Sequence, residues 1–222
     1  MLFRNFFNRD AIKTAKALLG KILRARYDKV WLCAQIIETE AYFQNEKGSH
    51  ASLGYTDKRK ALFMSPGTIY MYYARGFDSL NVSCRGKGNA VLIKSGYPCT
   101  NKKTSDKMIP MMQKLNPPKY GNGVRPFERL CAGQTLLCRS LGLKVKKWDQ
   151  QQFDPDRFYI EDIGASPTQI IQTTRLGIPE KRDDHLLYRF IDSEFANFCT
   201  SNPLTRRNYV EGKHYRLIQY PK

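Results

Sequence analysis

The sequence lacks long apolar runs. No stretch approaches the roughly 18 apolar residues of a membrane-spanning helix. The first ten residues carry Arg4 and Arg9 among aromatic side chains, and no apolar segment of the kind that a secretory signal requires follows them. We therefore expect a cytoplasmic protein with no membrane association.

The sequence also lacks cysteine in metal-binding spacing. None of the six cysteines forms a Cys-x-x-Cys pair, and none has a histidine nearby in zinc-finger spacing. We therefore expect no metal site and no other cofactor, and we interpret the cysteines as free, mostly buried thiols. They are Cys33, Cys84, Cys99, Cys131, Cys138 and Cys199.

Acidic residues are scarce. Asp and Glu number 20 against 37 Lys and Arg, so the formal net charge is +17, and the excess is spread along the chain. Such an excess favours a polyanionic partner, with nucleic acid ahead of anionic lipid. With 222 residues, of which 41% are hydrophobic, the chain can bury the core of one domain, and we expect residues 1–222 to form it as a monomer.

The first part of the sequence shows residue patterns of both a helix and strands. Apolar residues recur three and four apart over residues 10–19, where Asp10 suits the start of a helix and Gly20 its end. Residues 21–26 and 31–42 are predicted to be strands joined at residues 27–29.

Three more strands are predicted over residues 68–73, 80–84 and 90–94, the last two linked by the glycine-rich turn 85–89. The fold class is therefore α+β, with a curved, mostly antiparallel sheet and flanking helices.

Beyond Pro98 the pattern is weaker. We interpret residues 101–107 as a lysine-rich loop that leads into a methionine-rich segment and a Pro-Pro pair at residues 117–118, which must interrupt any helix. This region would be a loop or lid. A short helix over residues 134–141 and a strand over residues 158–160 follow.

Two acidic residues end the second predicted strand. Glu38 and Glu40 lie two residues apart, so their carboxylates share a face if the strand persists. Paired carboxylates are typical of enzymes that hydrolyse glycosidic bonds. Taken alone, the segment is better explained as a solvated strand end that pairs with basic side chains.

Five segments in order change this balance. They are AKALLGKIL (residues 15–23), IIETEAY (36–42), SHAS (49–52), FMSPGTIYMYY (63–73), and LN followed by GNAVLIKS (80–81 and 88–95). Together they resemble the alkyladenine, or 3-methyladenine, DNA glycosylase family in both order and spacing. Weaker similarity follows at residues 130–143, 173–178 and 188–190.

The resemblance assigns roles to two charged residues. Glu40 matches the family's general base, which acts on the water that attacks C1′ of the extruded nucleotide. Lys94 stands where the family has an arginine that helps to hold this water, and lysine keeps the charge but loses the planar fork. Glu38 would then be structural. No lysine nucleophile is implied.

The resemblance also implies a base pocket. Tyr42 and Tyr72 match tyrosines that stack on the two faces of the base, and His50 matches a histidine that hydrogen-bonds near the base and the sugar phosphate. Asn81 matches an asparagine that crowds the amino group of guanine. Without the resemblance, Tyr70, Tyr72 and Tyr73 would be ordinary strand aromatics, and His50 would be an unremarkable histidine.

One departure concerns the hairpin Tyr70–Asn81, which the resemblance places in the DNA minor groove as a protruding element. Family members insert a tyrosine just before a glycine that matches Gly76, and this chain has Arg75 there. The wedge is therefore Arg75 itself or a neighbour such as Tyr73 or Phe77.

The implied function is that of a monofunctional glycosylase. It would flip 3-methyladenine, 7-methylguanine, hypoxanthine or ethenoadenine out of double-stranded DNA and leave an abasic site for base excision repair. In a bacterium it would associate with the nucleoid, and in a eukaryote it would be nuclear. Two alternatives stay open: a damaged-DNA-binding module of the same fold with impaired catalysis, and a carbohydrate or nucleoside hydrolase that uses Glu38 and Glu40 as a pair.

Overall fold

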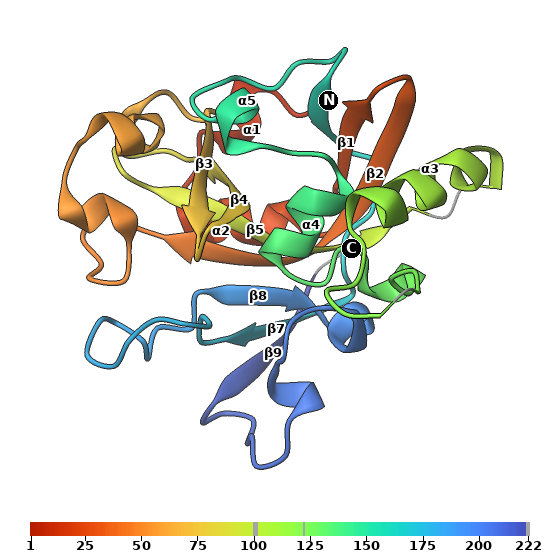
Figure 1. The fold of residues 1–222 in the computed structure, drawn as a ribbon. Coiled ribbons are helices and arrows are strands. Elements are labelled where there is room, and N and C mark those ends of the chain that lie inside the picture. Colours follow the sequence, from red (N-terminus) through yellow and green to blue (C-terminus); the bar gives the residue numbers. More distant parts are fainter. Residues whose placement is uncertain (100–101, 122, 221–222) are drawn as a thin grey trace.

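The computed structural model describes residues 1–99, 102–121 and 123–220, with the backbone alone for residues 102–105, and one nine-stranded sheet runs through this part of the chain (Figure 1). The strand order is β3-β4-β5-β2-β8-β7-β9, and β1 pairs with both β2 and β6. Each of these pairings is antiparallel, which confirms the predicted fold class. The strands are β1 (Ile22–Tyr27), β2 (Val30–Tyr42), β3 (Ile69–Ala74), β4 (Phe77–Ser83), β5 (Ala90–Pro98), β6 (Phe158–Glu161), β7 (Gln169–Thr173), β8 (Arg189–Asp192) and β9 (Tyr215–Gln219).

The sheet branches at β2. Residues 30–35 of β2 pair with β1, residues 38–40 pair with β8, and β5 pairs along residues 34–42. Because β5 overlaps both other partners, β1 and β8 must share the opposite edge of β2, one after the other. The register with β5 shifts between Ile36 and Thr39, at the point where β1 gives way to β8. Glu38 and Glu40 therefore lie at the branch.

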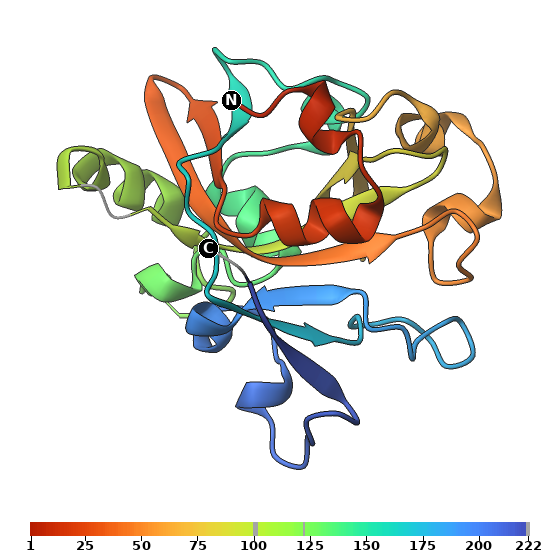
Figure 2. The same ribbon diagram turned by 180° about the vertical axis from the view of Figure 1, so that it is seen from behind.

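Helices cover both faces of the central strands. The predicted first helix is α2 (Ala11–Leu18), where the Asp10 carboxylate accepts a 2.9 Å hydrogen bond from the amide of Lys13 and Gly20 adopts a φ of +82°. It packs on β2 and β5, while α4 (Gln134–Ser140) packs on β4 and β5 from the other side (Figures 1 and 2). The remaining α-helices are α1 (Arg4–Phe7), α3 (Lys102–Leu115) and α5 (Val145–Trp148), and 3₁₀-helices span His50–Leu53, Asp57–Phe63, Phe127–Arg129, Ser193–Phe198 and Pro203–Thr205.

The loop or lid predicted over residues 101–107 is wrong for the residues that the structure describes, since α3 begins at Lys102; Asn101 lies outside them. Met108 and Met112 lie four residues apart on one helical face and are completely buried in the main core. Their burial outweighs the cost of Pro110 inside the helix. The helix ends at Leu115, before the Pro-Pro pair, as predicted.

Sequence patterns did not predict β7, β8 and β9. Each has four or five residues and lacks a strong alternation of apolar and polar residues. These strands form through pairing with one another and with β2. The six cysteines are free thiols, and all but the half-buried Cys99 are buried, as predicted. Within the described residues, no helix has the length and hydropathy needed to span a bilayer.

Candidate active site

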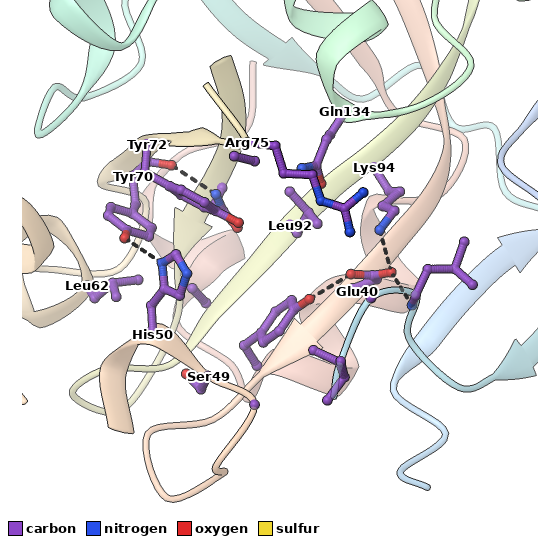
Figure 3. A pocket seen from close by; sticks show the side chains of 18 of the residues that line it. Glu40, Ser49, His50, Leu62, Tyr70, Tyr72, Arg75, Leu92, Lys94 and Gln134 are labelled. Atoms are coloured by element: carbon purple, nitrogen blue, oxygen red, sulfur yellow. Dashed lines mark hydrogen bonds and ion pairs between the residues drawn. The ribbon is translucent and has the colours of Figure 1, made fainter. Parts of the chain in front are cut away.

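A pocket of about 720 Å³ opens between the β3–β4 hairpin, the central strands and the segment that follows β7 (Figure 3). Its volume is in the range of small-molecule sites. The residues that line it include nearly all of those singled out in the sequence: Glu40, Tyr42, His50, Tyr70, Tyr72, Tyr73, Arg75, Asn81 and Lys94. Residues from four separate parts of the chain therefore meet here.

Glu40 lies at the bottom of the pocket and is fully buried. The Lys94 ammonium nitrogen is 2.9 Å from Glu40 Oε1, and the backbone amide of Leu176 donates to the same oxygen over 3.4 Å. The Tyr42 hydroxyl donates to Oε2 over 2.7 Å (Figure 3). Three donors from β2, β5 and the segment after β7 therefore fix one carboxylate.

This environment favours the ionised form of Glu40. Burial opposes ionisation, but the charges of Lys94 and Arg189 and the hydrogen bond from Tyr42 outweigh it and lower the pKa of Glu40. Burial and the nearby Glu40 charge raise the pKa of Tyr42 well above its usual value. The site thus combines a negative carboxylate with a neutral phenol that donates to it.

A bulge in β5 brings Lys94 to this carboxylate. Ser95 pairs with Glu38 and Ile93 pairs with Thr39, so Lys94 has no partner on β2 in the register. Neighbouring side chains of a regular strand point to opposite faces. Here the irregularity lets Lys94 reach Glu40 while Ser95 donates to Glu38.

Glu38 belongs to a separate, closed cluster. It is fully buried, and it accepts hydrogen bonds from Arg189 Nε at 2.7 Å, from the Thr200 hydroxyl at 2.6 Å and from the Ser95 hydroxyl. Glu38 is not among the residues that line the pocket. The geometry therefore gives no support to a hydrolase that would use Glu38 and Glu40 as a pair.

Aromatic side chains form the opposite wall of the pocket. The His50 ring packs against Tyr72 with 4.3 Å between ring centroids, and its Nδ1 lies 3.0 Å from the hydroxyl of Tyr70. Desolvation of the histidine ring and the nearby positive charges of Arg59 and Arg182 lower the pKa of His50. The histidine is therefore neutral at physiological pH and can both donate and accept a hydrogen bond.

Asn81 sits beside this wall and is largely buried. Its amide nitrogen donates to the carbonyl oxygen of Tyr70 over 3.2 Å, across the β3–β4 pair. This bond fixes the Asn81 side chain at the pocket surface.

The tip of the β3–β4 hairpin is a two-residue turn. Arg75 and Gly76 both have positive φ, +50° and +83°, a combination required by type I′ turns. The Arg75 side chain extends over the pocket toward Glu40 and Lys94 (Figure 3). The Arg75 guanidinium reaches the opposite side of the pocket at Gly177, so close that a β-carbon added to this glycine would lie 3.7 Å from it. Arg75 therefore spans the pocket mouth.

The other two wedge candidates differ in their surroundings. Tyr73 is 53% exposed, and Phe77 is 46% exposed with the guanidinium of Arg139 4.6 Å from its ring centroid. Both rings are therefore accessible at the hairpin.

Sequence reasoning missed the contribution of the segment after β7. Leu176 contacts Glu40, and Gly177, Ile178, Pro179 and Arg182 also line the pocket. The buried Arg175 lies behind Tyr42. The weak similarity at residues 173–178 and 188–190 was the one signal for these residues, because no periodic pattern marks them.

Comparison with known proteins identifies the family of the chain. A model of the methylpurine-DNA glycosylase family matches residues 5–195. The chain belongs to this family. The match includes every residue that lines the pocket, and it confirms the family predicted from the five segments.

Several relatives of this methylpurine-DNA glycosylase family member span most of the chain. A protein of Pseudomonas savastanoi pv. phaseolicola named "Putative 3-methyladenine DNA glycosylase" is 60% identical over 214 residues, which cover 96% of this chain and 95% of that protein. A protein of the same name from Pseudomonas aeruginosa (strain LESB58) is 59% identical over 213 residues, 96% and 88% of the two chains. The Mus musculus protein named "DNA-3-methyladenine glycosylase" is 33% identical over 181 residues, 78% of this chain and 53% of that protein.

Proposed function

We propose that this protein is a monofunctional DNA glycosylase that removes damaged purines from double-stranded DNA and leaves an abasic site for base excision repair. The observation that carries the proposal is the buried Glu40, paired with Lys94 at the bottom of an aromatic-lined pocket of about 720 Å³, in a member of the methylpurine-DNA glycosylase family. The substrates are 3-methyladenine, 7-methylguanine, hypoxanthine and ethenoadenine. Because its proposed substrate is genomic DNA, we expect the protein in the cytoplasm with the nucleoid if the organism is a bacterium, and in the nucleus if it is a eukaryote.

Glu40 is the general base. Each carboxylate oxygen has two lone pairs. Within the described residues, Oε1 accepts from Lys94 and Leu176, while Oε2 accepts from Tyr42 alone. The attacking water donates to the free position on Oε2, gives its proton to Glu40 and adds to C1′, while the electron pair of the N-glycosidic bond leaves with the base. Lys94 holds the carboxylate ionised until that step. A cationic alkylated purine departs as a neutral base, and hypoxanthine departs as an anion that takes a proton from solvent.

The damaged base occupies the space between Tyr42 and the wall formed by Tyr72 and His50. Stacking favours electron-poor rings, and a positively charged alkylated purine gains most from a π face. Asn81 crowds the exocyclic amino group of guanine, so normal guanine is disfavoured. Because damaged or mispaired bases cost less to extrude, selection begins before the base enters the pocket.

Binding to the duplex relies on the positive charge of the protein and on the hairpin tip. The net charge of +17 supplies attraction to phosphates. Arg75 then leaves the pocket mouth and enters the minor groove, where its guanidinium fills the space of the extruded base, with the exposed Tyr73 and Phe77 in support. Tyr70, which the sequence also predicted at the minor groove, is 3% exposed and lies in the pocket wall against His50 instead. The protein acts as a monomer.

Excision assays test this proposal. Duplexes with a single 3-methyladenine, hypoxanthine or ethenoadenine are incubated with the protein, and abasic sites are then cleaved with alkali. Strand breaks that depend on the alkali step are expected for at least one lesion. No product from any lesion, with tight binding to lesion DNA retained, would instead identify a binding module of the same fold that has lost catalysis.

A further inference from the structure

A buried ion pair lies directly behind one wall of the pocket. Arg175, 4% exposed, follows β7, and Glu46, 5% exposed, lies between β2 and the 3₁₀-helix at His50. Arg175 Nη1 is 2.5 Å from Glu46 Oε2, and this oxygen makes no other polar contact within the described residues. The pair is therefore a cation and an anion held together out of water.

Arg175 is fixed against Tyr42. Its guanidinium carbon lies 4.5 Å from the centroid of the Tyr42 ring and 5.5 Å from that of Tyr188, and Nη1 donates to the carbonyl of Ala41 over 2.9 Å. Tyr42 also lines the pocket. A base that stacks on Tyr42 therefore lies on the face opposite the guanidinium.

This arrangement places a permanent charge close to the base. Arginine is protonated at any pH that a protein survives. A base stacked on the far face of Tyr42 would have the guanidinium about 8 Å away, a distance at which poorly screened charges still interact strongly. Without compensation, Arg175 would repel purines that carry the positive charge of N3 or N7 alkylation.

Glu46 supplies the compensation. Among the described residues, it is the acidic side chain that forms an ion pair with Arg175. The pKa of Glu46 is raised overall, because burial and the nearby Asp183 charge outweigh the Arg175 charge and the hydrogen bonds that lower it. Asp183 also contacts Arg175, through its backbone carbonyl oxygen at 3.5 Å.

We propose that Glu46 determines specificity: by neutralising Arg175 behind Tyr42, it allows the pocket to accept cationic alkylated purines as well as neutral lesions. This inference rests on the proposed function, since it concerns the same pocket. Glu46 and Arg175 act through Tyr42 and through their charges rather than by contact with the base, because neither residue lines the pocket.

Binding to uncleavable duplexes tests this role without interference from catalysis. The lesion nucleotide carries a 2′-fluoro substituent, which slows N-glycosidic cleavage, and the base is either 7-methylguanine, which is cationic, or hypoxanthine, which is neutral. The dissociation constants of both duplexes are measured with the same protein preparation at a pH slightly below neutral, where 7-methylguanine keeps its N1 proton and therefore its net positive charge. For Glu46→Gln we expect the affinity for the cationic lesion to fall about tenfold relative to that for the neutral lesion.

Two further variants separate charge from structure. Glu46 also accepts a 2.9 Å hydrogen bond from the amide of Phe43, so its loss can loosen the loop and weaken both affinities. The double variant Glu46→Gln/Arg175→Met removes both charges, and we expect the ratio of affinities to return to the wild-type value. Glu161→Gln, which breaks the ion pair with Arg24 outside the pocket, is the control that leaves the ratio unchanged.

A ratio that stays at the wild-type value in Glu46→Gln overturns the inference, as does a double variant that keeps the altered ratio. Excision of unmodified lesions by the wild-type protein is measured in parallel. If the wild type excises them while the ratio does not respond to Glu46→Gln, the inference fails and the proposed function stands. If the wild type excises nothing, the proposed function fails on its own.

Discussion

Two buried acidic clusters lie side by side on β2, and they differ in what they leave free. Glu38 and Glu40 are both fully buried, with a cationic nitrogen 2.7 Å and 2.9 Å away, respectively. Glu38 Oε1 accepts from Arg189 and Thr200, and Oε2 accepts from Ser95 and the Thr200 amide. Glu40 Oε2 has Tyr42 as its one protein donor among the described residues and faces the pocket.

The comparison teaches that burial and an ion pair do not by themselves mark a reactive carboxylate. Four acceptor positions are available on each group. Those of Glu38 are filled by protein donors, so this carboxylate can hold structure but cannot accept a proton from water. Those of Glu40 are not all filled, so it can do both.

Breaking the closed cluster has the largest expected effect. Arg189→Met leaves the Glu38 charge buried without its cation, and we expect the free energy of unfolding to fall by about 3–5 kcal/mol. Urea denaturation measures this loss. Arg24→Met, which removes the cation of a partly exposed pair, is the matched control, with an expected loss of about 0–1 kcal/mol. Equal losses in the two variants would mean that the cluster around Glu38 is not structural.

The cluster around Glu40 faces the pocket and is the open cluster of the pair. Removing its cation, Lys94, affects catalysis. Lys94→Met takes away the charge nearest to Glu40, and we expect excision at neutral pH to slow about hundredfold. The base works in its ionised form, so activity is lost as pH falls through its pKa. That pKa lies below the usual value in the wild type and rises in the variant, so the acid limb of the pH–rate profile moves to higher pH.

The control for this experiment is Lys94→Arg, which keeps the charge and should keep the acid limb near its wild-type position. An acid limb that does not move in Lys94→Met would show that Lys94 does not hold the ionised form of Glu40.

Removing the hydrogen bond to the open oxygen has a smaller effect. Tyr42→Phe keeps the ring that we propose stacks on the damaged base, but it loses the 2.7 Å donor to Glu40 Oε2. A hydrogen bond to a charged group contributes about 1.5–3 kcal/mol, so we expect excision to slow by about tenfold or somewhat more, with DNA affinity little changed. Single-turnover kinetics measure this effect. Tyr97→Phe, outside the pocket, serves as the control, and a wild-type rate for Tyr42→Phe would contradict the role of its hydroxyl.

The hairpin tip lies outside both clusters and has the smallest expected effect. Arg75→Ala removes one exposed charge, so we expect DNA affinity to fall about threefold. The slope of log affinity against log salt should decrease by about one if Arg75 meets one phosphate. The fluorescence of 2-aminopurine beside the lesion reports extrusion, and an unchanged signal would assign the wedge to Tyr73 or Phe77. Arg206→Ala is a control on a segment that does not line the pocket.

The open cluster could largely be predicted from the sequence, and the closed one could not. Glu40, Tyr42 and Lys94 lie on long strands whose residue pattern is local, and the family segments cover them. Arg189, the cation of the closed cluster, begins β8, a four-residue strand that is fixed by pairing with β2 and β7, so no local pattern marks it.

The helix α3 was missed for a related reason. Pro110 is an unfavourable helix signal along the chain, whereas the burial of Met108 and Met112 depends on tertiary contacts. One of these is the 3.4 Å contact between the sulfur atoms of Met108 and Cys33, which lie 75 residues apart in sequence. Long-range burial of this kind outweighs local propensity.

The central claim is that Glu40 is the general base and that Glu38 is its structural neighbour. It is tested most directly by the single-turnover rate of hypoxanthine excision, measured for Glu40→Gln and Glu38→Gln and normalised to the folded fraction of each protein. We expect a loss of about a thousandfold or more for Glu40→Gln with DNA binding retained, and a rate within about tenfold of the wild type for folded Glu38→Gln. Excision by Glu40→Gln at the wild-type rate would contradict the account.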